Sequence, residues 1–293
     1  MSLLEAILMG VIQGVTEFLP VSSSGHLALF KILFHVETET GMLFDVLLHL
    51  GTLLAVLAVF YKDIFRMIWE GVAIIGDFFK DVGIFAGNFV MKKDEPYYRL
   101  VDNSYRKFVM LVVVSTIPTG IIGYIGADVV EAASGVLLAP GICLVLTAVL
   151  LVISDYVADG TKMPRNVTYS NAFFIGICQG FATLPGLSRS GTTISVCLLS
   201  KFNRKFAVKY SFIMSIPAIL GAVVLKLTEL SDIKVTASEI GCYAAGVACS
   251  AIVGYICIKT MLVVVKKKKF TYFAIYCLFV GIISIVGHFV VKL

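Results

Sequence analysis

The sequence contains one segment twice, and this repetition constrains the fold more than any other feature. Residues 9–26 read MGVIQGVTEFLPVSSSGH, and residues 175–193 read IGICQGFATLPGLSRSGTT. Gln179 lies 166 positions after Gln13. The other pairs with this spacing are Gly10 and Gly176, Gly14 and Gly180, Ser22 and Ser188, Ser24 and Ser190, and Gly25 and Gly191. A period of this length predicts two halves of one fold rather than a solenoid.

The composition predicts a membrane protein. Hydrophobic residues make up 59 % of the 293 positions and charged residues only 15 %. A soluble domain cannot bury that much apolar surface, and the long continuous apolar runs indicate helices rather than a β-barrel. The seven cysteines have no spacing that suits a zinc site or a disulfide framework. The N-terminus lacks a basic region and a cleavage pattern, so we expect no removable signal peptide.

Six apolar stretches have the ~20-residue length that crosses a hydrocarbon core. They are 43–61, 108–127, 136–154, 208–227, 238–259 and 270–291. The repeated segments, 1–30 and 170–200, are instead interrupted by a proline and a polar cluster, which predicts a re-entrant hairpin in each. We therefore predict an all-α integral membrane protein with a single membrane domain, 1–293. Its two inverted-topology repeats, 1–154 and 170–293, each hold a re-entrant helical hairpin plus three transmembrane helices.

Loop charges predict the orientation of the chain. The basic loops are 62–66, 92–107, 162–165, 201–209 and 266–269, and the acidic loops are 128–134 and 228–237. Under the positive-inside rule the basic loops are cytoplasmic. All the loops then lie on the side that the rule predicts only if each hairpin returns to the side of the membrane from which it entered. Because each half contains three spans, an odd number, the second repeat has the opposite orientation in the membrane. Inverted repeats with broken helices place a site at their interface, within the membrane.

Residues 67–91 are the exception to the simple pattern of spans. This apolar stretch is interrupted by Glu70, Asp77, Lys80 and Asp81. We predict an amphipathic interfacial helix inside a cytoplasmic loop, 62–107. If the segment spans the membrane instead, the charge argument fails.

The candidate site residues lie in the repeated segments. Gln13 and Glu17 are four residues apart and share a helix face. A carboxylate near the bilayer centre costs about 2.5–3.5 kcal/mol on insertion scales, so Glu17 is a functional candidate. The alternative is a structural role, in which Glu17 only pairs with a buried basic side chain.

Hydroxyl groups follow both prolines. They belong to Ser22, Ser23, Ser24, Ser188, Ser190 and Thr193. They can cap the following half-helices, whose free amides also attract anions. Caps alone do not require Arg189, whose planar guanidinium matches phosphate oxygens. With Glu17 and His26, these groups predict a phosphate-handling centre; His49 could line the same cleft.

These residues resemble a known family. Gln13-xxx-Glu17 with Pro20–His26, followed by PGLSRSGTT at 185–193, is similar to the bacterial undecaprenyl-diphosphatase, or bacitracin-resistance, family over essentially the whole chain. The resemblance implies hydrolysis of undecaprenyl diphosphate to the monophosphate plus phosphate, which recycles the lipid carrier for cell-wall synthesis. It also implies a divalent cation, Mg²⁺ or Ca²⁺, and a site that opens toward the extracytoplasmic face of the bacterial plasma (inner) membrane. Gln13 replaces a glutamate of other members, which leaves one carboxylate fewer for the metal.

On this basis we assign roles as a hypothesis. Catalytic roles are expected for Glu17, His26, Ser23 and Arg189, and substrate contacts for Gln13, Ser22, Ser24, Ser188, Ser190 and Thr193. Glu17 and Gln13 would hold the metal on the diphosphate. His26 would act as acid or base, because its pKa lies near working pH. The nucleophile stays open among water, Ser23 and His26.

Two other functions compete with hydrolysis. Broken helices in inverted repeats also suit a flippase for polyprenyl phosphate, either instead of the enzyme or in addition to it. A lipid-binding scaffold would leave Glu17 and Arg189 unexplained. The expected partners are the polyprenyl diphosphate and membrane lipid, with no nucleic acid, and a homodimer is left open.

Overall fold

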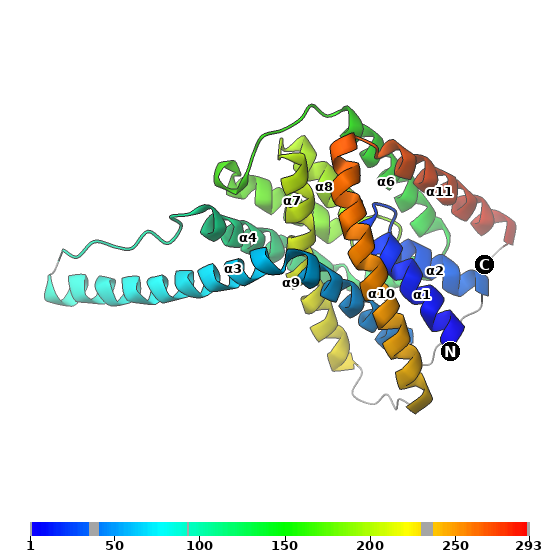
Figure 1. Ribbon diagram of the computed structural model, residues 1–293, viewed down its shortest axis with the longest axis horizontal. Coiled ribbons are helices and arrows are strands. Elements are labelled where there is room, and N and C mark those ends of the chain that lie inside the picture. The colour runs from blue at the N-terminus through cyan, green and yellow to red at the C-terminus, as the bar shows by residue number, and fades with distance from the viewer. Residues whose placement is uncertain (1, 35–40, 93, 230–236, 292–293) are drawn as a thin grey trace.

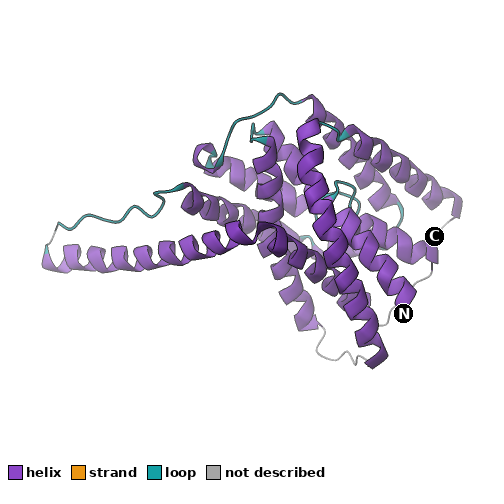
Figure 2. Cartoon of the chain, viewed as in Figure 1, coloured by secondary structure: helices purple, strands orange, loops and turns teal. Residues whose placement is uncertain are grey.

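The computed structural model describes residues 2–34, 41–92, 94–229 and 237–291 (Figure 1). Within these ranges every regular element is a helix (Figure 2), and six helices are long and apolar enough to cross a bilayer. These six are α3 (Gly41–Met91), α4 (Ser104–Ile125), α6 (Leu138–Tyr156), α9 (Arg204–Glu229), α10 (Ala237–Val264) and α11 (Thr271–Val291). The predicted all-α, multi-pass membrane protein is confirmed. Residues 230–236 of the predicted acidic loop lie outside the described ranges.

Each repeated segment forms two short helices joined by a turn. The pairs are α1 (Leu3–Phe18) with α2 (Ser23–Phe34), and α7 (Tyr169–Phe181) with α8 (Arg189–Leu199). A helix rises about 1.5 Å per residue, so none of the four reaches across a core ~30 Å thick. Both breaks fall at the prolines, Pro20 and Pro185, which have no amide hydrogen to donate.

Equivalent serines cap the second helix of each pair. Ser22 Oγ accepts a hydrogen bond from the Gly25 amide at 3.3 Å, and Ser188 Oγ accepts one from the Gly191 amide at 3.0 Å. Each cap satisfies one of the amides that the start of a helix leaves free. The capping role expected for these two hydroxyls is therefore confirmed.

The two turns pack against each other through the equivalent glycines. A Cβ added to Gly25 would lie 3.0 Å from Gly186 Cα, and one added to Gly191 would lie 3.2 Å from Pro20 Cβ. Gly186 also adopts a φ of +88°, which favours glycine. The halves of the chain therefore meet where both copies of the repeated segment break.

The paired glycines of α1 and α7 let a second helix come close. A Cβ on Gly10 would clash with the carbonyl oxygen of Gly246 in α10. In the same way, a Cβ on Gly180 would lie 2.7 Å from the Cβ of Ile122 in α4. Because helices in lipid associate largely through close van der Waals packing, these notches fix α1 on α10 and α7 on α4.

Aromatic residues of the core hold the end of α1 against α9. The Phe18 ring meets the Phe212 ring edge-on, with centroids 5.2 Å apart, and both side chains are fully buried. The buried Tyr210 of α9 donates its hydroxyl hydrogen bond to the Leu111 carbonyl oxygen of α4 at 3.0 Å. This packing fixes the position of the residue before Phe18, which is Glu17.

The structure corrects two predicted loops. The loop expected at 62–66 is helical, because α3 continues to Met91 after a kink at Phe60 (φ −108°, ψ 20°). No glycine or proline occurs between residues 52 and 70, so nothing in the sequence ends the helix there. The predicted helix at 67–91 is therefore the far end of α3, and it projects away from the other helices (Figure 1). The loop expected at 128–134 is a short helix, α5 (Ala127–Ser134).

Candidate active site

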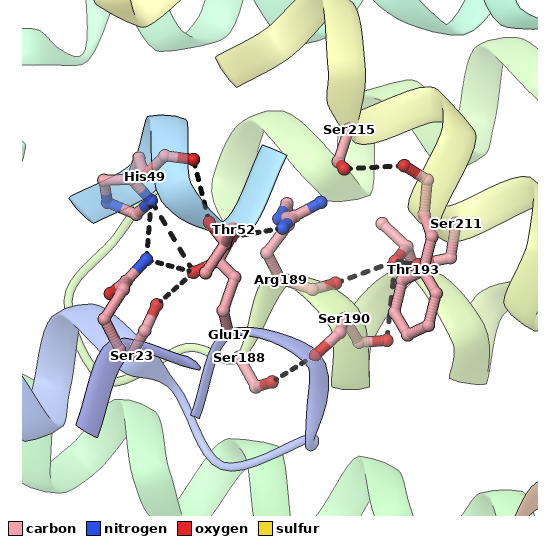
Figure 3. A network of polar contacts seen from close by, with 12 residues as sticks. Glu17, Ser23, His49, Thr52, Ser188, Arg189, Ser190, Thr193, Ser211 and Ser215 are labelled. Atoms are coloured by element: carbon pink, nitrogen blue, oxygen red, sulfur yellow. Dashed lines mark hydrogen bonds and ion pairs between the residues drawn. The ribbon is translucent and has the colours of Figure 1, made fainter. Parts of the chain in front are cut away.

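The two copies of the repeated segment meet in a buried ion pair. Glu17, in the last turn of α1, accepts a hydrogen bond through Oε1 from Nη2 of Arg189, the first residue of α8 (Figure 3). The Glu17 side chain is 4 % exposed and that of Arg189 is 17 % exposed. Removing either partner would leave a buried charge without its counter-charge, which is strongly destabilising.

Other polar groups converge on the second carboxylate oxygen of Glu17. The Ser23 hydroxyl donates to Oε2 at 2.5 Å, and the Gln13 side-chain amide donates to it at 3.1 Å. The same Gln13 nitrogen lies 2.9 Å from His49 Nδ1, which is 3.7 Å from Glu17 Oε2. Because the amide nitrogen is a donor, His49 Nδ1 accepts in this arrangement. The predicted face of Gln13 and Glu17 is confirmed, and His49 does line the same site.

Helix α10 brings His49 to this position. Gly51 of α3 packs so closely on α10 that an added Cβ would lie 2.6 Å from the Val247 carbonyl oxygen. Ser250 of α10 donates its hydroxyl hydrogen bond to the Leu48 carbonyl oxygen at 2.7 Å. Since α1 packs on the same helix, α3 and α1 present His49 and Glu17 to each other.

Two buried polar atoms of the site have no hydrogen-bond partner among the described residues. They are Arg189 Nη1 and Gln13 Oε1. A buried donor or acceptor that stays unpaired costs free energy, so such atoms point to a ligand or solvent. One of the two is a cationic donor suited to an anion, and the other is a neutral oxygen suited to a cation.

The hydroxyls of the second copy support α8. Ser190 Oγ donates to the Leu19 carbonyl oxygen at 3.3 Å and lies 3.4 Å from Ser188 Oγ. Thr193 Oγ1 donates to the Arg189 carbonyl oxygen at 2.8 Å and lies 2.6 Å from Ser211 Oγ of α9 (Figure 3). These contacts hold the backbone of α8 around Arg189.

Helix α6 anchors the turn that leads into α8. The Ser188 amide donates to Thr147 Oγ1 at 3.0 Å, and Thr147 donates to the Gly186 carbonyl oxygen at 3.2 Å. We did not predict Thr147 or Ser211 as site residues, because each is a single hydroxyl in an apolar span with no local signal. Only the packing of helices far apart in sequence brings them here.

His26 makes its hydrogen bonds outside this cluster. Its Nδ1 lies 2.8 Å from the Ser22 carbonyl oxygen, and its Nε2 lies 2.7 Å from the hydroxyl of Tyr276 in α11. The two rings stack with centroids 5.5 Å apart. Ser24 is exposed, and its hydroxyl lies 3.4 Å from Ser22 Oγ. The catalytic role of His26 and the substrate contacts of Ser22 and Ser24 stay predictions.

The oxygen donors of the site suit a hard cation that is only partly enclosed by protein. Among the described residues, no group of three or more His, Cys, Asp or Glu side chains could cage a metal. Mg²⁺ is usually held by one or two carboxylates together with substrate phosphates and water. Glu17 with the unpaired Gln13 Oε1 fits that pattern of donors.

The chain is similar along nearly its whole length to proteins of a known family. The chain matches the family described as "Bacitracin resistance protein BacA" over residues 6–283. A protein of Methanosphaera stadtmanae named undecaprenyl-diphosphatase is 38 % identical over 286 residues, which cover 98 % of each chain. Proteins of the same name from Alkaliphilus metalliredigens and Bacteroides fragilis are also 38 % identical. Those alignments cover 97 % and 96 % of this chain, and 98 % and 97 % of the two relatives.

Proposed function

This chain belongs to the bacitracin resistance protein BacA family, and we propose that it hydrolyses undecaprenyl diphosphate to undecaprenyl phosphate and inorganic phosphate. The names of its relatives support this substrate. The observation that carries the proposal is the buried pair of Glu17 and Arg189, in which Arg189 Nη1 has no partner among the described residues. In a bacterial inner membrane, this activity would recycle the lipid carrier for cell-wall synthesis and give bacitracin resistance.

Arg189 would bind the terminal phosphate of the substrate. Its Nη1 is available to a phosphate oxygen while Nη2 stays on Glu17, and charge-assisted hydrogen bonds to phosphate are strong. The N-terminus of α8 adds free amides and a positive helix end on the same side. Phosphoryl transfer depends mainly on such positioning and charge stabilisation.

The Ser23 hydroxyl is the nucleophile that the geometry supports best. Its proton already points to Glu17 Oε2 at 2.5 Å, so Glu17 can accept it as the Ser23 oxygen attacks the terminal phosphorus. The bond from that phosphorus to the bridging oxygen then breaks, and undecaprenyl phosphate leaves. Water hydrolyses the phosphoserine and regenerates the hydroxyl. In the alternative, a water molecule in the same place gives its proton to Glu17 and attacks directly.

A divalent cation, Mg²⁺ or Ca²⁺, would be held by Glu17 and Gln13 Oε1. When bound, it would neutralise charge on the diphosphate oxygens. The contact with His49 supports this role for Gln13, because it keeps the amide nitrogen toward Glu17 and leaves Oε1 unpaired.

We further propose that the two halves are inverted repeats with re-entrant hairpins. Helix pairing supports this, since α1 packs on α10 and the equivalent α7 packs on α4. The α3–α9 and α6–α11 pairs each join two equivalent helices of the two halves. The hairpin helices are too short to span, and an extracytoplasmic opening of the site then follows from the loop charges.

The pairing of equivalent helices across the two halves is also typical of transporters, so a flippase for undecaprenyl phosphate is the second candidate function. The decisive experiment measures phosphate release from undecaprenyl diphosphate by the purified protein in detergent, with and without EDTA. Release that requires a divalent cation supports the hydrolase. No release by a protein that still binds undecaprenyl phosphate would overturn the enzyme and favour the flippase.

A further inference from the structure

The part of α3 beyond its kink, residues 61–91, forms an arm that leaves the other helices (Figure 1). At about 1.5 Å per residue the arm is roughly 46 Å long. The chain then returns along the arm through residues 94–103 and enters α4 at Ser104; we call residues 94–106, which include the start of α4, the strap. The proposed reaction uses neither segment.

The strap covers the polar face of the arm. Asn88 exchanges two 3.0 Å hydrogen bonds with the Glu95 backbone, and Asp81 accepts one from the Tyr98 amide at 2.7 Å. Nearer the bundle, Arg106 bridges Glu70 at 3.2 Å and Asp77 at 2.8 Å. These contacts run antiparallel between residues 70 and 88 of the arm, so its acidic side chains Glu70, Asp77 and Asp81 are paired with the strap.

The opposite face of the arm is apolar and exposed. Its residues include Ile68, Val72, Ile75, Phe79, Val82 and Phe89, with exposed fractions from 48 % to 78 %. They recur at helical spacing on one side, as in an amphipathic helix. An arm in water would cover this face and expose its polar one, whereas here the polar face is covered.

The arm cannot cross the membrane as a further span. The strap would then have to cross beside it as extended chain, with the backbone groups and charges of Asp94, Arg99 and Asp102 in lipid. Extended backbone does not cross the hydrocarbon core, because its polar groups find no partners there. The arm and the strap therefore stay on the side of the membrane where α3 leaves and α4 enters.

We propose that the arm lies in the plane of the membrane, with its apolar face in the lipid interface and the strap on its aqueous side. The arm joins a membrane span directly, so its base already sits at the bilayer surface. Residues 61–107 contain eight basic and seven acidic side chains. With so little net charge, the contact depends on apolar insertion and does not need anionic lipid.

The single tryptophan of the chain allows a direct test. Trp69 lies at the edge between the two faces of the arm and is 76 % exposed. The full-length protein is reconstituted into phosphatidylcholine vesicles whose acyl chains carry bromine, and quenching of tryptophan emission is compared with quenching by aqueous iodide. Two variants move the indole: W69F/F79W places it at the centre of the apolar face, and W69F/Y97W places it on the strap.

An interfacial helix buries its apolar face about 5–10 Å into the headgroup and acyl boundary. Bromolipid quenching should therefore fall in the order Trp at 79, Trp at 69, Trp at 97, and iodide quenching should follow the reverse order. The bromolipid should remove roughly half of the emission at position 79, in low or high salt. Equal iodide quenching at 79 and 97 would place the arm in water. Protection of position 79 from both quenchers would show that protein, such as a second copy, covers the face; either result overturns the proposal.

Discussion

Glu17 lies in the last turn of α1 and Arg189 begins α8, and their side chains pair across 172 positions of sequence. Glu17 lies at the negative, C-terminal end of the α1 dipole, and Arg189 lies at the positive, N-terminal end of the α8 dipole. An exposed charge of the same sign as its helix end destabilises the helix by about 0.3–1 kcal/mol. Each side chain, however, points to the end of the other helix, where the dipole favours it. The pair thus joins the helices of the two repeated segments and holds a guanidinium beside free helix amides.

Separate changes to this pair should nearly abolish phosphate release. Glu17→Gln removes the proton acceptor, and Arg189→Lys keeps a charge but loses the planar fork. We expect each to lower kcat about 10²–10³-fold, the range found when one electrostatic stabiliser is removed. Glu131→Gln and Arg165→Lys change exposed residues in the same way and should leave kcat unchanged. Activity within twofold of wild type for both site variants would contradict their roles.

The contact between His49 and Gln13 gives a second prediction. His49→Ala removes the acceptor of the Gln13 amide, so the amide loses its fixed orientation. We expect activity to fall about 10–100-fold, as for other partners that orient a ligand, and the Mg²⁺ concentration for half activity to rise. His49→Gln, which can still accept from the amide, should restore much of the loss. His288→Ala changes a histidine of α11 that is not part of the site, and this control should leave both the activity and the Mg²⁺ requirement unchanged. An unchanged metal requirement in His49→Ala would show that His49 does not position Gln13.

The sequence was sufficient to predict the class, the six spans, both helix breaks and the face of Gln13 and Glu17. These features follow from local rules: apolar length, proline chemistry and helical spacing. The contacts of Thr147 and Ser211 could not be predicted, because they depend on which helices pack together over long separations. The continuation of α3 through 62–66 differs from the loop expected there, because basic residues alone do not end a helix and no glycine or proline occurs between Gly51 and Gly71.

The glycine notches predict opposite effects for two similar substitutions. An added methyl on Gly180 would lie 2.7 Å from Ile122 Cβ, whereas one on Gly221 meets nothing within 4 Å. Gly180→Ala should therefore destabilise the protein by about 1–3 kcal/mol through overpacking. Gly221→Ala should stabilise α9 by about 0.5–1 kcal/mol, because alanine loses less backbone entropy in a helix. Thermal unfolding in detergent measures both; a Gly180→Ala protein as stable as wild type would contradict the close α7–α4 contact.

Ser23 and its neighbour Ser24 separate covalent catalysis from direct attack by water. Ser23 donates to Glu17, while Ser24 is exposed and lies near Ser22. Acid quenching during turnover of substrate labelled in the terminal phosphate should trap label on wild type and Ser24→Ala, and none on Ser23→Ala. Ser23→Ala should also lose phosphate release, because this variant lacks the attacking oxygen and not only a hydrogen bond. If Ser23→Ala keeps its phosphate release, water is the nucleophile. Glu17 would then accept the proton from that water, and the predicted loss in Glu17→Gln would remain.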